Sequence, residues 1–173
     1  MKYAVVYSSN TGNTEMLARR IPEVMEGQEC LGCRKPGAEA DAAAAEAEVV
    51  FAGFWTDKGN CDPKMAEFLE RLEGKTVFLF GTAGFGQSSE YFERILSGVK
   101  EHLKESNTVA GTWMCQGKMP MPVRKRYESM QESQPERAAQ LIANFDQALS
   151  HPDSADLQEF GEVVRKFAES VQK

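Results

Sequence analysis

The sequence lacks most of the features that would assign a small protein to a special class. No segment approaches the roughly 20 consecutive apolar residues that cross a bilayer, and the first residues predict a β-strand rather than a signal peptide. The formal net charge of −6 disfavours nucleic acid and anionic membranes, and it favours basic partners. We therefore expect a cytoplasmic protein that binds neither nucleic acid nor membranes.

Histidine and cysteine are scarce, with two and four residues. Cys30 and Cys33 form a Cys-x-x-Cys pair, a spacing that occurs in redox-active and metal-binding sites. No second pair follows at zinc-finger spacing, so we interpret the cysteines as thiols without a special role. His102 and His151 are isolated in the sequence and are expected on the surface. We predict no metal site.

The remaining sequence alternates between apolar runs and amphipathic stretches. Strands are predicted at residues 3–7, 29–34, 49–55, 76–80 and 108–115, with helices between them and two more near 136–149 and 155–171. Parallel strands need crossovers long enough to hold a helix. The pattern predicts an α/β fold: a doubly wound, five-stranded parallel sheet with helices on both faces. We expect one domain over residues 1–173, with an irregular insertion at about 116–135.

A polar turn at residues 8–14 joins the first strand to the first helix. Its hydroxyl and amide side chains lie next to the free N–H groups of a helix N-terminus, an arrangement typical of phosphate binding. The turn lacks the Gly-Lys-Ser/Thr ending of a nucleotide triphosphate loop and the three glycines of a dinucleotide fingerprint. It contains no lysine or arginine, which suits a phosphate that is bound but not transferred. The alternative is a polar helix cap.

Two further loops follow strands three and four. Each combines glycines and small polar residues with a large aromatic residue, Trp55 in one and Phe85 in the other. A planar heterocycle needs an aromatic face to stack on and backbone groups at its edge. In doubly wound sheets such loops meet at the carboxyl edge of the strands. The three loops together predict one cofactor site.

These residues resemble the flavodoxins. The segment from Ser9 to Thr14 is similar to their phosphate-loop signature, Thr/Ser-x-Thr-Gly-x-Thr. Gly86-Gln87-Ser88-Ser89 is similar to their Gly-Asp-Ser-Ser, with Gln87 in place of the acid. The resemblance covers about residues 1–115 and the last helix. It implies strand order 2-1-3-4-5, flavin mononucleotide (FMN) as cofactor, and electron transfer.

The resemblance also implies which residues bind FMN. The phosphate is assigned to Ser9, Asn10, Thr11, Gly12, Asn13 and Thr14. The flavin ring and its edge are assigned to Trp55, Thr56, Asp57, Lys58, Gly59, Thr82, Ala83, Gly84, Phe85 and Gly86. Many family members have a tyrosine just after the Ser-Ser, where this chain has Glu90; two alternatives stay open, that Phe85 or Tyr91 replaces it, or that one flavin face is more open.

Three classes of function remain open. The first is a non-enzymatic FMN-dependent electron carrier that shuttles single electrons between redox protein partners, as a monomer; the short chain and its acidic charge favour it. The second is an FMN reductase acting on a quinone or another small acceptor. The third is an interaction module that has lost flavin, which the intact phosphate loop disfavours. For the carrier, acidic residues are expected near the flavin edge, namely Asp57, Asp62, Glu67 and Glu90.

The stretch from 116 to 135 departs from the family. It places Lys118, Arg124, Lys125 and Arg126 close together on an acidic protein. Two interpretations stay open: a segment that covers the flavin edge or docks a partner, and a solvated connector with its basic run on a short helix.

Overall fold

The computed structural model describes residues 1–86 and 88–172. Gln87, which the resemblance places where flavodoxins have an acid, lies outside the described residues, as does Lys173. The strands are β1 (Lys2–Tyr7), β2 (Glu29–Arg34), β3 (Val49–Asp57), β4 (Asn60–Cys61), β5 (Thr76–Ala83) and β6 (Thr108–Gln116). The helices are α1 (Asn13–Val24), α2 (Ala38–Glu46), α3 (Pro63–Arg71), α4 (Ser89–Lys100), α5 (Met121–Ser129), α6 (Pro135–Ala148) and α7 (Ser154–Val171).

The main sheet has the order β2-β1-β3-β5-β6, with every neighbouring pair parallel. Counted without β4, this is the predicted order 2-1-3-4-5, so the predicted fold class is confirmed. The sequence did not predict β4, which pairs antiparallel with the end of β3. A two-residue strand carries too little alternation of apolar and polar residues to be recognised.

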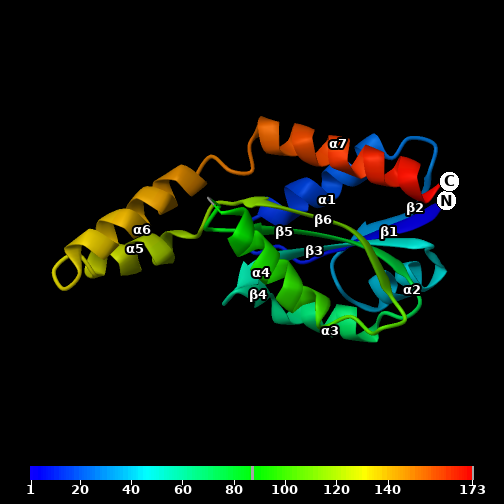
Figure 1. Ribbon diagram of the computed structural model, residues 1–173, viewed down its shortest axis with the longest axis horizontal. Coiled ribbons are helices and arrows are strands. Elements are labelled where there is room, and N and C mark those ends of the chain that lie inside the picture. Colours follow the sequence, from blue (N-terminus) through cyan, green and yellow to red (C-terminus); the bar gives the residue numbers. More distant parts are fainter. Residues whose placement is uncertain (87, 173) are drawn as a thin grey trace.

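Helices cover both faces of the sheet. One core joins α1 and α7 to the sheet and contains Leu17, Ile21, Phe160 and Val164. The other joins α2, α3 and α4 to the opposite face. Figure 1 shows α1 and α7 above the sheet and α2, α3 and α4 below it. Central strands enclosed in this way are buried on both faces, which explains why β3 and β5 are almost entirely apolar.

Glycines and phenylalanines pair across the central strands. Gly53 lies opposite Phe80, and Phe54 lies opposite Gly81 on the same two strands. A Cβ built on Gly53 would lie 2.3 Å from the Phe80 ring, and one on Gly81 would lie 2.5 Å from the Phe54 ring. Each ring therefore occupies the space that a neighbouring side chain would fill. Both pairs lie near the carboxyl ends of the strands.

Two strands extend further than the sequence predicts. Thr56 and Asp57 continue β3 because they pair with β4. Thr82 and Ala83, predicted to lie in a loop, continue β5 because they pair with Cys115 and Gln116 of β6. The loops begin later than predicted, and several predicted site residues belong to regular strand ends.

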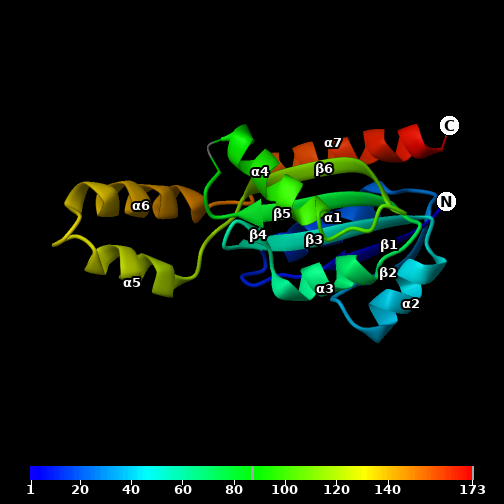
Figure 2. The same ribbon diagram turned by 60° about the horizontal axis from the view of Figure 1, so that its bottom comes forward.

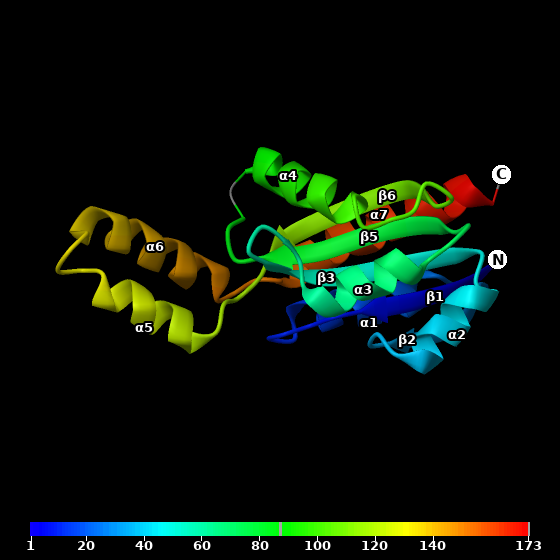
Figure 3. The same cartoon turned by 90° about the horizontal axis from the view of Figure 1, so that it is seen from below.

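Helices α5 and α6 form a helical hairpin, which we call the prong (residues 121–148). It projects from the end of the molecule opposite the two termini (Figures 2 and 3). The predicted irregular insertion is wrong for residues 121–129, since these form α5. The basic run lies on a short helix, as one of the two interpretations expected, although the segment is more than a solvated connector because it also lines a cavity. Among the described residues, no helix combines the length and apolar character needed to cross a membrane.

Candidate functional site

A cavity of about 480 Å³ lies at the carboxyl edge of the sheet. Its walls come from the turn before α1, the end of β3 with its hairpin turn, the end of β5, the start of α4, the segment after β6, and α5. The lining residues are Asn10, Thr11, Asn13, Trp55, Thr56, Asp57, Lys58, Gly59, Thr82, Ala83, Gly84, Phe85, Tyr91, Gly117, Lys118, Met119, Pro120, Val123, Arg126 and Tyr127.

The turn before α1 is shaped by backbone geometry. Gly12 is the N-cap residue with φ of 87°, a left-handed conformation that favours glycine, and it has no side chain to cap the helix. The Ser9 hydroxyl instead accepts a hydrogen bond from the Glu15 N–H at 3.3 Å. Thr14 is fully buried, and its hydroxyl contacts the Phe54 carbonyl and the Thr82 hydroxyl, both at 3.1 Å. These contacts fix the turn against β3 and β5.

The segment after β6 packs on the same turn. The Thr11 hydroxyl and the Asn13 amide both donate to the Lys118 carbonyl, at 3.2 and 2.9 Å. The Lys118 N–H donates to the His151 carbonyl at 3.0 Å. One residue of the insertion thus bridges the polar turn and the segment leading into α7, a connection that the sequence did not predict.

The turn between β3 and β4 forms another wall. Lys58 and Gly59 are its two central residues, with φ values of 51° and 79°. Positive φ at both positions is typical of the type I′ turn that joins two antiparallel strands through two residues. The Thr56 hydroxyl donates to the Thr82 carbonyl at 2.8 Å, which holds this hairpin against β5. Trp55 lies half-buried at the base of the hairpin.

The third wall follows β5. The Gly84 carbonyl accepts hydrogen bonds from the Gln116 and Asn144 amides, both at 3.0 Å. Phe85 is 40% exposed, and its ring makes an edge contact with Tyr91 at 6.2 Å between centroids. Burial, and to a lesser extent the neighbouring Tyr127, raise the pKa of Tyr91, so its hydroxyl stays protonated at neutral pH. This wall offers aromatic surface with a hydrogen-bond donor.

Most of the predicted site residues line the cavity. Four do not: Ser9, Gly12, Thr14 and Gly86. Ser9, Gly12 and Thr14 belong to the polar turn and set its conformation without lining the cavity. A Cβ on Gly86 would lie 2.3 Å from the Cβ of Gln116, so this residue is needed for close packing of the loop.

Sequence reasoning missed the wall that α5 supplies. Val123, Arg126 and Tyr127 line the cavity, together with Met119 and Pro120 just before the helix. A signal was present, because Val123 and Tyr127 are four residues apart and therefore share one face of α5.

The charges around the cavity differ from the expectation. Of the four acidic residues expected near the flavin edge, only Asp57 is among the lining residues. Asp62 is buried as the N-cap of α3, and Glu67 and Glu90 are exposed on α3 and α4. Three cations line the cavity instead: Lys58, Lys118 and Arg126. The cavity has a positive rim on a protein whose net charge is −6.

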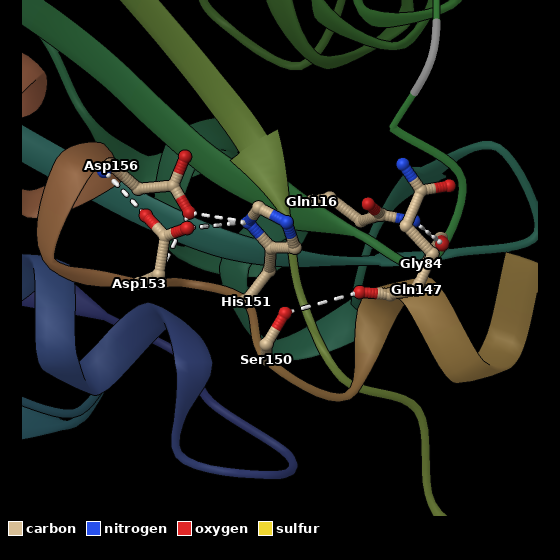
Figure 4. Close-up of polar contacts among 7 residues, drawn as sticks. All are labelled: Gly84, Gln116, Gln147, Ser150, His151, Asp153 and Asp156. Carbon is tan, nitrogen blue, oxygen red and sulfur yellow. Dashed lines mark hydrogen bonds and ion pairs between the residues drawn. The ribbon is translucent and has the colours of Figure 1, made fainter.

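His151, expected to be isolated, belongs to a polar cluster where the prong joins α7. Its Nδ1 lies 2.6 Å from Asp156 Oδ2 and 3.8 Å from Asp153 Oδ2 (Figure 4). The two carboxylates also accept each other's backbone N–H groups and form a capping box at the start of α7. The three ligand atoms lie within 4.8 Å of one another. The cluster anchors the base of the prong.

Stability is expected to depend on pH through Asp153. Its carboxylate accepts the Asp156 N–H and lies near His151, and these contacts hold its pKa below the ordinary 3.8. A lowered folded-state pKa stabilises the protein at pH values above 3.8, and this contribution is lost as the pH falls through the folded-state pKa. Asp153→Asn keeps a capping oxygen without the charge. Urea unfolding from pH 7 to 3 should show a steeper loss for the wild type than for this variant, and parallel losses would contradict the assignment.

Three of the four cysteines are poorly reactive thiols. Burial raises the pKa of Cys33 to about 11 and that of Cys61 to about 12, and it also raises the pKa of Cys115. The thiolate is the reactive form, so these three residues are almost entirely unreactive at neutral pH. Cys33 donates weakly to the Ala18 carbonyl.

The cavity fits FMN by its chemistry. Asn13 lines the cavity, and its amide oxygen is buried without a hydrogen-bond partner among the described residues. The uncapped start of α1 suits a phosphate. Trp55, Phe85 and Tyr91 offer faces to a planar ring system.

The sequence is similar to a known protein family and to two described proteins. A sequence model described as a flavodoxin domain matches residues 4–165. A flavodoxin-like domain-containing protein, BilS of Clostridium symbiosum (strain WAL-14163), is 44% identical over 176 residues, covering 92% of each chain. A protein of the same description from Clostridioides difficile (strain CD3) is 30% identical over 161 residues, again covering 92% of each.

Solved structures show the same fold. A flavodoxin from the domain Archaea superposes with a TM-score of 0.65 at 20% identity, covering 100% of both chains. Oxidised Flavodoxin 2 from Bacillus cereus gives 0.62 at 16% identity, covering 98% of this chain and 99% of the other.

Proposed function

The chain belongs to the flavodoxin family, and we propose that it binds FMN and carries single electrons between redox proteins. The observation that carries this proposal is the cavity itself. It joins the start of α1 and three aromatic residues in one space. Bound FMN supplies the capacity to accept and release electrons one at a time. The four unpaired cysteines support a cytoplasmic location.

The residues have distinct roles in this proposal. Asn10, Thr11 and Asn13 would hold the phosphate together with the first N–H groups of α1. Trp55 and Tyr91 would face the flavin ring. Exposed rim residues, including Phe85, would leave one edge of the cofactor accessible to a partner, which electron transfer between proteins requires.

A second candidate function is supported by the prong. Met119, Pro120, Val123 and Tyr127 add a largely apolar wall to the cavity. Such a wall suits a small planar acceptor beside the flavin, as in an FMN reductase acting on a quinone.

One preparation tests the proposal and separates the two functions. We expect the purified protein to be yellow, to release about one FMN per chain on denaturation, and to oxidise NAD(P)H negligibly without a partner reductase. Rapid turnover of NAD(P)H with a quinone would favour the second function. A protein that stays colourless with excess FMN would contradict both.

A further inference from the structure

The prong carries two cations that form no ion pair with the described residues, and one of them, Arg126, lines the cavity. Lys125 and Arg126 of α5 are exposed, and neither forms an ion pair with any residue that the structure describes. Arg124, one residue earlier, is paired with Glu128 at 3.0 Å and with Asp146 of α6. Arg124 therefore holds the two helices together, whereas Lys125 and Arg126 remain available to another molecule.

The prong is held firmly in place beside the cavity. The Gln116 and Asn144 amides bind the Gly84 carbonyl, so α6 and the end of β6 are attached to the loop after β5. Lys118 binds the polar turn before α1, as well as the His151 carbonyl. Within the prong, Phe145 is fully buried and Tyr127 nearly so. Because these contacts fix its root, the prong presents a pre-organised surface.

Exposed apolar side chains gather at the same end of the molecule. The four large ones that are exposed among the described residues are Met16, Phe85, Met121 and Leu149. Met16 lies in the first turn of α1, Phe85 follows β5, Met121 begins the prong, and Leu149 directly follows it. Apolar residues flanked by unpaired charges are characteristic of protein interfaces.

We propose that the prong is a docking element for a redox partner whose contact face is acidic. This inference rests on the proposed function. The net charge of −6 favours basic partners at long range, but the rim cations Lys58 and Arg126, with Lys125 beside them, reverse the sign at the cavity mouth. Charge complementarity at this range determines the orientation and rate of docking. The partner approaches over α5.

Small redox probes test the charge at the cavity mouth without a known partner. The FMN-loaded protein is reduced and mixed in a stopped-flow instrument with ferricyanide, an anion, or with hexaammineruthenium(III), a cation. We expect the ferricyanide rate to fall as ionic strength rises, in spite of the net charge. The Lys58→Gln/Arg126→Gln variant should react with ferricyanide about fivefold more slowly at about 50 mM salt, where screening between exposed charges is incomplete.

A matched variant removes the same charge elsewhere. Lys64→Gln/Lys100→Gln replaces two exposed lysines on α3 and α4, and its ferricyanide rate should stay within about twofold of the wild type. A ferricyanide rate that rises with salt, or an equal loss in both variants, overturns the proposal and indicates a basic partner or no local steering. The flavin absorbance of the wild-type protein is measured before the kinetics. Its absence would overturn the proposed function and this inference with it.

A second measurement locates the contact. Poly-L-glutamate at low salt should shift the backbone amide resonances of residues 118–128 in the FMN-loaded protein, and those of α3 should stay unchanged. Shifts confined to other elements contradict docking on the prong.

Discussion

Replacing Asn10 with aspartate is expected to weaken FMN binding about 100-fold and to leave riboflavin binding within about twofold. Asn10 is exposed on the turn that leads to α1, and it lines the cavity. Two unit charges about 6 Å apart repel by about 2.8 kcal/mol at an effective dielectric constant of about 20, which corresponds to about 100-fold in affinity. Riboflavin has no phosphate, so it does not experience this repulsion.

Flavin fluorescence quenching measures both affinities with the same protein. Asn10→Gln is the matched control, because it keeps a neutral amide at the same position. Equal losses for FMN and riboflavin would show that the substitution damages the turn itself. Unchanged FMN binding would place the phosphate elsewhere and contradict the site.

Adding one methyl group to Gly81 or Gly53 is expected to destabilise the fold by about 3 kcal/mol, at the upper end of typical overpacking costs. In Gly81→Ala the new Cβ would lie 2.5 Å from the Phe54 ring, and in Gly53→Ala it would lie 2.3 Å from the Phe80 ring. Both rings are fully buried, so they have no room to move. For a chain of this length the melting temperature should fall by about 6–12 °C.

Thermal or urea unfolding checks this result, and two variants control it. Gly161→Ala in α7 makes the same chemical change, but the nearest atom would be Arg20 Nε at 3.2 Å, on a side chain that can shift. Its cost should stay below about 1 kcal/mol. Gly81→Ala/Phe54→Leu should be less destabilised than the sum of the two single changes, because the smaller side chain relieves the clash. Additive effects would exclude a direct conflict between the two residues.

The central sheet could be predicted from sequence because its strands are buried on both faces. Continuous apolar runs at residues 3–7, 49–55 and 76–80 leave little room for another assignment. Their carboxyl ends could not be placed, since Thr82 and Ala83 look like loop residues and become strand through pairing with residues distant in the sequence, on β3 and β6. Helix starts were predictable where the cap is local, as at Asp62, which accepts the Met65 N–H.

Helix α6 was predicted, at about 136–149, but its pairing with α5 into the prong could not be, because that arrangement depends on both helices. Helix α5 buries only Tyr127 and has few apolar residues, so its sequence carries a weak amphipathic signal. Its position beside the cavity follows from contacts between distant residues, such as Gln116 with Gly84 and Asn144. The polar turn and the aromatic residues of the site were predictable, because those features are local to single loops.

The Lys118 carbonyl links the polar turn before α1 to the segment that leads into the projecting hairpin. It takes the hydroxyl hydrogen of Thr11 and an amide hydrogen of Asn13, two side chains assigned to the phosphate. Nucleotide binding and the position of the projecting hairpin are therefore energetically coupled. The Thr11 hydroxyl has one hydrogen, so the Lys118 carbonyl and a phosphate compete for it. By thermodynamic reciprocity, a molecule that steadies this contact lowers the affinity for the nucleotide, and the nucleotide lowers the affinity for that molecule by the same factor.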